Sequence, residues 1–144
     1  MRIRRLSPGD LEGWRVLFQA YIDFYAAEVA EDVIQRTWAR CLAGDDGFLG
    51  LAAVDANDRI FGLAHVLFHP STWSPTTYCY LEDLYVDATR RRSGAGRALI
   101  EAVYAEADAR GCTRTYWVTM DGNQEARALY ERVARRAPFV QYRR

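Results

Sequence analysis

The sequence contains no lysine: all 19 of its basic residues are arginine. A P-loop requires a lysine after its glycines, in the pattern GxxxxGK[ST], so this class of nucleotide site is excluded. The chain also has no excess charge, since 19 acidic residues balance the 19 basic ones. A net charge of zero gives no general reason to bind nucleic acid or an anionic membrane, and neither partner is expected.

Cysteine is scarce, and the three present, Cys41, Cys79 and Cys112, form no CxxC pair. Their odd number and wide spacing argue against a zinc site and against a disulfide framework, so no metal is expected. We interpret them as buried or inert thiols of a reducing cytosol, which favours a cytoplasmic protein. The sequence has no run of about 18 apolar residues and no signal-peptide h-region, so neither a membrane-spanning helix nor secretion is expected.

Half of the 144 residues are hydrophobic, which predicts a single domain, residues 1–144, with a sizeable core. Alternating and β-branched runs predict strands, and apolar spacings of three and four predict helices that start at capping residues. The expected strands are 3–6, 48–54, 60–68, 78–86, 113–119 and 139–142, and the expected helices start at Ser7, cover 31–42, end near Arg110 and begin at Asn123. The second helix should stop at 44–47. The order is therefore β-α-α-β-β-β-α-β-α-β, an α/β (α+β) fold with an antiparallel hairpin over 48–68.

The stretch TRRRSGAGRALI, residues 89–100, joins a predicted strand to a predicted helix. The free N–H groups of a first helical turn and the helix dipole favour an anion there, above all a pyrophosphate. Gly94 and Gly96 let the backbone approach such a ligand closely. Three arginines can add charge-assisted bonds to phosphate oxygens: Arg91, Arg92 and Arg97.

A Rossmann fingerprint would require a third glycine where Leu99 stands, and it normally lies near the first strand. The pattern Arg91-x-x-Gly94-x-Gly96 instead resembles the R/Q-x-x-G-x-G/A signature of the GCN5-related N-acetyltransferase (GNAT) family. LEDLYV, residues 81–86, resembles that family's fourth strand, and Asn123 followed by Tyr130 resembles its second conserved block. More narrowly, the chain resembles the histone/polyamine (diamine) acetyltransferase-like branch.

This resemblance implies a mixed, mostly antiparallel twisted sheet of six or seven strands flanked by about four helices. It implies acetyl-CoA as co-substrate, with the pyrophosphate held by the Gly-rich turn and the pantetheine arm held by the strand before it. The implied cofactor-binding residues are Leu84, Tyr85, Val86, Arg91, Arg92, Ser93, Gly94, Ala95, Gly96, Arg97, Asn123 and Tyr130. The chain departs from the family at Arg92, where glycine is common.

Acetyl transfer to an amine requires a neutral amine, a stabilised oxyanion and a protonated leaving thiolate. Tyr130 is the expected general acid, since a phenol is protonated at neutral pH. Glu82 is the expected base, directly or through a water. Strand alternation predicts that Glu82 and Asp83 lie on opposite faces. His65 and His69 are alternative bases.

Other residues are candidates for the acceptor side. Aromatic side chains can line an amine pocket through cation–π contacts, and acidic residues between the first two helices can attract a cationic amine. The aromatic candidates are Trp73, Tyr78 and Tyr80, and the acidic ones are Glu28, Glu31 and Asp32. Core packing is favoured over a pocket role for at least two of the aromatic residues, and a solvated helix start explains the acidic residues equally well.

The sequence therefore predicts an acetyl-CoA-dependent N-acetyltransferase. The resemblance implies direct attack by a primary amine of a polyamine, a small molecule or a protein in a ternary complex. The alternative is a non-catalytic acyl-CoA-binding regulatory domain, which would need neither Glu82 nor Tyr130. An arginine-rich nucleic-acid module is not favoured, because only 90–92 is a run of three consecutive basic residues. Since dimers are common in the family, a homodimer is expected.

Overall fold

The structure is a computed structural model of the chain and describes residues 1–44 and 47–144. Its strands are β1 (Arg2–Arg5), β2 (Phe48–Val54), β3 (Ile60–Pro70), β4 (Thr77–Val86) and β5 (Arg114–Tyr116). Its α-helices are α1 (Leu11–Phe24), α2 (Glu31–Ala43), α3 (Ala95–Ala109) and α4 (Gln124–Val133). Two short 3-10 helices, η1 (Pro8–Asp10) and η3 (Ala88–Arg90), precede α1 and α3.

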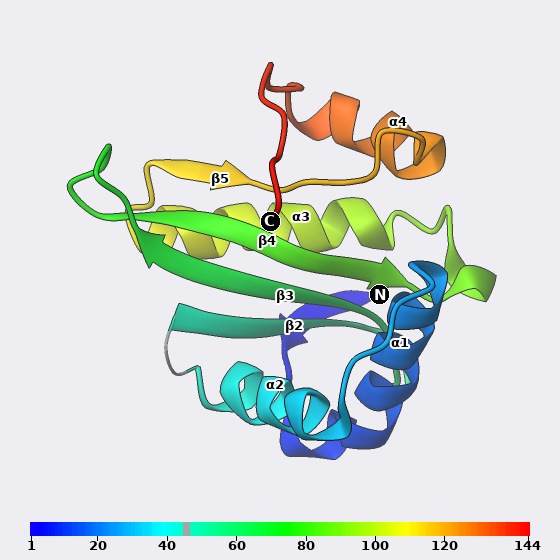
Figure 1. Cartoon of the computed structure of the whole chain (residues 1–144). Helices are drawn as coiled ribbons and strands as arrows, with labels where there is room; N and C mark the ends of the chain where they lie inside the picture. The colour runs from blue at the N-terminus through cyan, green and yellow to red at the C-terminus, as the bar shows by residue number, and fades with distance from the viewer. Residues whose placement is uncertain (45–46) are drawn as a thin grey trace.

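The strands form one mixed sheet in the order β1-β2-β3-β4-β5 (Figure 1). Neighbours from β1 to β4 run antiparallel, and β4 pairs with β5 in parallel. The predicted hairpin is confirmed, with Phe48 opposite Leu67 in β2 and β3. Helix α3 makes the crossover that a parallel pair requires. The predicted fold class is therefore confirmed.

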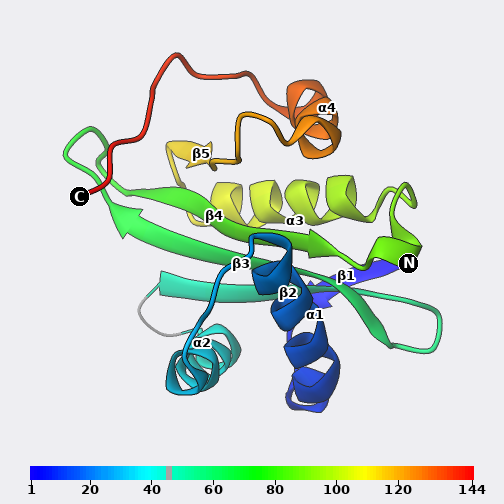
Figure 2. The ribbon, with the colours of Figure 1, turned by 45° about the vertical axis from the view of Figure 1, so that its right-hand side comes forward.

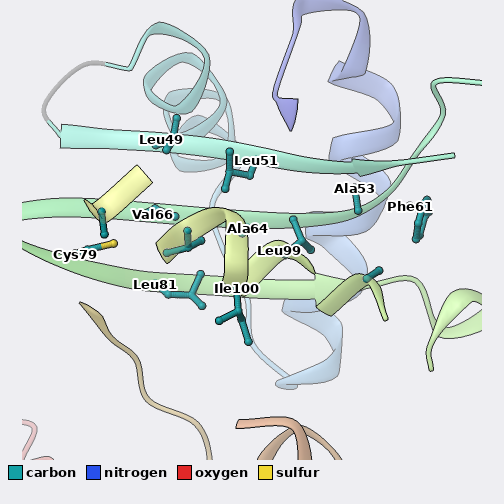
Figure 3. Close-up of a cluster of buried hydrophobic side chains, with 13 residues drawn as sticks. Leu49, Leu51, Ala53, Phe61, Ala64, Val66, Cys79, Leu81, Leu99 and Ile100 are labelled. Atoms are coloured by element: carbon teal, nitrogen blue, oxygen red, sulfur yellow. The ribbon is translucent and has the colours of Figure 1, made fainter. Parts of the chain in front are cut away.

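Helices cover both faces of the sheet: α3 lies on one side, and α1 and α2 lie on the other (Figures 1 and 2). The α3 side holds a core in which Leu99 and Ile100 pack against strand residues such as Val66 and Leu81 (Figure 3). The other side holds a second core around Trp14, which is completely buried. The spacing of apolar residues along α1 and α3 predicted these buried faces.

The strand count is smaller than the expected six or seven, because the described residues form five strands. The expected strand at 139–142 is wrong: this segment has no regular structure, and Phe139 and Tyr142 are 84% and 91% exposed. A strand requires an edge to pair with, and β5, expected over 113–119, is only three residues long. Pro138 also offers no N–H to a partner.

Helix α2 ends as predicted at Gly44, whose φ of +69° is the left-handed conformation that glycine adopts most readily. Of the expected stop at 44–47, Asp45 and Asp46 lie outside the described residues. No helix in the described part of the chain combines the length and apolar character needed to cross a membrane.

Candidate active site

Strand β4 carries a bulge at its centre. His65 pairs with Asp83 and Val66 pairs with Leu81, so Glu82 is an extra residue with no partner in β3. A bulge interrupts the alternation of side chains along a strand. The expectation that Glu82 and Asp83 lie on opposite faces is therefore wrong: Glu82 and Tyr21 line one cleft, and Tyr21 also contacts Asp83.

The end of β4 separates from β5. Pairing between them stops at Tyr80 opposite Tyr116, and the chain then leaves the sheet toward α4 (Figure 1). On the other edge, the Asp87 N–H donates to the Phe61 carbonyl at 2.8 Å. Because antiparallel strands bond at every second residue, the backbone groups of Leu84 and Val86 point away from β3 into the gap.

A cleft of about 250 Å³, part of it open to solvent, lies where the two strands separate. Its walls come from α1 and the residue after it, β4, the segment after β5, and α4. The lining residues are Tyr21, Tyr25, Leu81, Glu82, Leu84, Trp117, Val118 and Tyr130. The two residues expected to act as base and acid, far apart in sequence, thus share one cleft.

The surroundings of Glu82 and Tyr130 raise the pKa of both side chains. Loss of hydration, reinforced by the neighbouring Asp83 carboxylate, raises the pKa of Glu82 above its usual range. A carboxylate with a raised pKa is a stronger base. Burial, with a smaller contribution from Tyr25, raises the pKa of Tyr130 to about 12. Tyr130 therefore keeps its proton at neutral pH and can donate it.

The two histidines offer no free ring nitrogen to the cleft. His65 is 1% exposed, and its nitrogens contact Trp14 and Asp83, each at 2.8 Å. His69 donates from Nδ1 to the Pro70 carbonyl at 2.8 Å, so its Nε2 accepts from the Tyr116 hydroxyl at 2.7 Å. Neither imidazole is arranged as a base for an amine in the cleft.

The Gly-rich turn presents an open helix start. Gly94 is the N-cap of α3, with φ +83°, and it has no side chain to cap the helix. The first helical bond runs from the Ala98 N–H to the Gly94 carbonyl at 3.0 Å. The three preceding N–H groups, from Ala95 to Arg97, therefore have no acceptor within the helix and favour an anion.

The two glycines of the signature have different local roles. Gly94 adopts a conformation that other residues adopt only with strain, whereas Gly96 allows α4 to approach α3. A Cβ at position 96 would lie 3.1 Å from Leu129 Cδ2. Arg92 also has a positive φ, +60°, which explains why glycine is common at this position of the motif.

The arginines of the turn already have acidic or aromatic neighbours. Arg91 lies 3.7 Å from Glu125, and Arg97 lies 2.7 Å from Glu101. These carboxylates are 62% and 56% exposed, so the pairs are weak and an arriving phosphate can replace them. Arg90 stacks over the Phe61 ring, 4.6 Å from its centre.

Asn123 is occupied as the N-cap of α4. Its Oδ1 accepts from the Ala126 N–H at 3.5 Å, and its Nδ2 donates to Thr119 Oγ1 at 3.1 Å. It does not line the cleft. Its structural role is to start the helix that carries Tyr130.

None of the six acceptor-side candidates is among the residues that line the cleft. Trp73 is 87% exposed, Glu31 forms an ion pair with Arg15, and Tyr78 and Tyr80 cluster with Tyr116. Sequence reasoning assigned no site role to five residues that line the cleft: Tyr21, Tyr25, Leu81, Trp117 and Val118. The only sequence signal for them was helical or strand periodicity, which does not distinguish a residue that lines a cleft from a residue of the core.

Cysteine chemistry does not contribute to the site. Burial raises the pKa of Cys41 to about 12 and that of Cys79 to about 11, so both are protonated thiols. The described residues contain no group of three or more His, Cys, Asp or Glu side chains that could hold a metal ion.

We expect Gly94→Ala to lower the free energy of unfolding by about 1–2 kcal/mol, because a Cβ at a positive φ approaches the following carbonyl oxygen. Urea denaturation measures this loss. Gly122→Ala is the matched control, since its Cβ would meet nothing within 4 Å and its φ is not positive. Equal losses in the two variants would contradict the assigned strain.

Comparisons with known proteins identify the family of the chain. A family model described as the acetyltransferase (GNAT) family matches residues 14–134. The chain is 36% identical over 144 residues to the D-amino-acid N-acetyltransferase HPA3 of Saccharomyces cerevisiae, across 99% of this chain and 89% of that protein. It is 38% identical over 63 residues to the thialysine N-epsilon-acetyltransferase of Caenorhabditis elegans, across 44% and 39% of the two chains. A crystal structure described as a probable acetyltransferase matches with a TM-score of 0.86 at 23% identity, across 99% of this chain and 96% of that one, and supports the fold alone.

Proposed function

Because this chain belongs to the GNAT acetyltransferase family and is an N-acetyltransferase, we propose that it moves the acetyl group of acetyl-CoA to a primary amine of a small molecule. The amine attacks directly, in a ternary complex. The observation that carries the proposal is the cleft that Glu82 and Tyr130 line together. The unpaired end of β4 forms part of the same cleft.

Each step of the reaction has a candidate group, either in the cleft or at the end of β4. Glu82 takes the proton of the acceptor ammonium and frees the nitrogen lone pair for attack. The Val86 N–H, which points away from β3, donates to the oxygen that becomes negative as the amine adds. Tyr130 then gives its proton to the thiolate as the carbon–sulfur bond breaks, and the second proton that the nitrogen loses on forming the amide replaces the proton of Tyr130. The raised pKa of Glu82 strengthens it as a base, and the raised pKa of Tyr130 keeps its hydroxyl protonated until the thiolate leaves.

The Gly-rich turn fits the phosphates of acetyl-CoA, which supplies the activated acyl group when bound. The N–H groups of Ala95, Gly96 and Arg97 lack acceptors in the helix, and no side chain caps α3. Arg91 and Arg92 lie beside them in sequence and add positive charge. We propose that the backbone from Leu84 to Val86 holds the pantetheine arm. Ser93 and Asn123 complete the proposed set, Asn123 by placing α4.

The acceptor is proposed to be the amine of an amino acid or a related small molecule. Both named relatives act, by name, on amino-acid amines: a D-amino acid in one case and thialysine in the other. Glu82 and Asp83 give this part of the molecule a negative character that favours a cationic amine. Polyamines and protein amines are the further acceptors to compare.

Thiol release over a panel of amines tests the function. We expect release of CoA with D- or L-amino acids, thialysine or polyamines, and none without an amine. Acetyl-CoA at about 100 times its Kd should also raise the melting temperature by about 8 °C, since it stabilises the folded state by about 2.7 kcal/mol. No shift at millimolar acetyl-CoA would contradict the cofactor, and a shift without turnover would favour the regulatory alternative.

We also propose that the enzyme works in the cytoplasm as a homodimer. The support for assembly is the segment after α4, where Phe139, Val140 and Tyr142 are 84%, 76% and 91% exposed. Exposed apolar side chains in sequence proximity are typical of an interaction surface. The molar mass in solution, measured by light scattering, tests this assembly.

A further inference from the structure

Two consecutive hydrogen bonds connect the core to the bulge of β4. The Trp14 indole donates to His65 Nε2 at 2.8 Å, and His65 Nδ1 lies 2.8 Å from Asp83 Oδ2. An indole nitrogen can only donate, so Nε2 is the acceptor and the ring proton is on Nδ1. His65 therefore donates to the Asp83 carboxylate. Trp14 is 0% exposed and His65 is 1% exposed, so the first bond is buried, and the second is part-buried because the Asp83 side chain is 17% exposed.

The second bond is formed where the strand register shifts. His65 is opposite Asp83, the next residue of β3 is opposite Leu81, and Glu82 is the extra residue between them. Two adjacent carboxylates make this register ambiguous, because a shift of one residue would place Glu82 opposite His65. Asp83 would then be the extra residue of the bulge, and Glu82 would be held by His65 instead of lining the cleft.

We propose that Trp14 and His65 are positioning residues that lock the β4 bulge in the register that directs Glu82 into the cleft. The proposal rests on the proposed function, in which Glu82 is the base. We refer to the three residues Trp14, His65 and Asp83 as the bulge clamp. Neither Trp14 nor His65 lines the cleft, so both act through β4.

The residues around His65 allow only one orientation of its imidazole ring. Phe18 packs edge-on against the imidazole with the ring centres 4.9 Å apart, and Trp14 lies 5.8 Å away. Turning the ring over would place a carbon atom against each hydrogen-bonding partner and leave two buried polar groups unpaired. Asp83, 17% exposed, is thereby held by one oxygen, and contact with its charge contributes to the raised pKa of Tyr21.

Two substitutions of His65 distinguish the role of its N–H donor from the role of the ring. His65→Leu removes both hydrogen bonds and should lower kcat by about 100-fold, the effect of misplacing a reacting group by about 1 Å. The KM for acetyl-CoA should stay close to wild type, because the Gly-rich turn is unaltered. His65→Asn keeps an N–H near the position of Nδ1 and should recover most of kcat. A leucine variant with wild-type kcat would overturn the proposal.

Trp14→Phe tests the first bond while keeping an aromatic ring in the core. This variant should lower kcat with an unchanged KM for acetyl-CoA. It also tests the proposal if the His65→Leu variant does not fold. The matched control is Trp38→Phe: Trp38 packs against Trp14 with ring centres 5.0 Å apart, and its indole has no hydrogen bond to a described residue. Equal losses of kcat in the two tryptophan variants would assign the effect to packing and overturn the clamp.

Nitrogen-15 NMR of His65 provides a measurement that needs no activity. We expect the wild-type ring to carry its proton on Nδ1 and none on Nε2, and the Glu82 amide resonance to shift in Trp14→Phe more than in Trp38→Phe. A proton on Nε2 would overturn the proposal even in an active enzyme. Should the protein transfer no acetyl group, the proposed function fails, and the NMR result still decides whether the clamp exists.

Discussion

Tyr130→Phe is expected to lower kcat by about 100-fold, the contribution typical of a positioned general acid, with little change in the affinity for acetyl-CoA. The substitution removes one hydroxyl from the cleft and keeps the ring that packs edge-on against Trp117, with ring centres 5.4 Å apart. Because burial raises the pKa of Tyr130 to about 12, the wild-type hydroxyl is protonated throughout the neutral range. Steady-state kinetics and calorimetric titration with CoA separate turnover from binding.

Tyr104→Phe is the matched control. Burial also raises the pKa of Tyr104, and its hydroxyl donates to the Val133 carbonyl at 2.9 Å, but it does not line the cleft. We expect a small loss of stability and a kcat close to wild type. A Tyr130→Phe enzyme with wild-type kcat would remove Tyr130 from the reaction, and a matching fall in CoA affinity would make it a binding residue.

The strand–turn–helix that forms the proposed phosphate site could be predicted because its signals are local. Gly94 stands where the chain has φ +83°, and the apolar spacing after it fixes the buried face of α3. Arg92 shows what these local signals do not predict. An arginine at this position suggests only a positive charge, whereas the structure gives it a φ of +60°, a backbone conformation that glycine adopts more readily.

The bulge at Glu82 could not be predicted from alternation, because pairing with a distant strand decides it. Val66 opposite Leu81 satisfies the apolar core on one face, and His65 opposite Asp83 satisfies a hydrogen bond on the other. Both pairs can form only if Glu82 stays unpaired between them. Local propensity contains no information about such a long-range choice.

The expected strand at 139–142 failed for a related reason. Its apolar residues have strand propensity, but a strand forms only where an edge is available, and β5 offers three residues. Tyr21 in α1 and Tyr25 just after it could not be assigned to the cleft for the same reason. Their spacing predicted a buried face, and only the separation of β4 from β5 turns part of that face into a wall of the cleft.

Glu82→Gln is expected to lower kcat/KM for the amine by about 100-fold, because glutamine keeps the size of the side chain but cannot accept a proton. Initial rates of thiol release at saturating acetyl-CoA measure the effect. Glu131→Gln is the control: it makes the same change on α4, in an exposed pair with Arg127 at 3.3 Å, outside the cleft. Equal rates in the two variants would show that another group, such as a chain of waters, is the base.

The pH profile of kcat/KM identifies the base more directly. Loss of hydration and the Asp83 charge raise the pKa of Glu82, so the rate should fall as the pH drops through a value above that of an ordinary glutamate. Asp83→Asn removes the neighbouring charge, lowers the pKa of Glu82 and should move this limb to lower pH. The asparagine oxygen can still accept from His65, which keeps the bulge clamp in place. Ionisation of the acceptor amine is common to both enzymes, so a limb that does not move, or moves to higher pH, would exclude Glu82 as the titrating group.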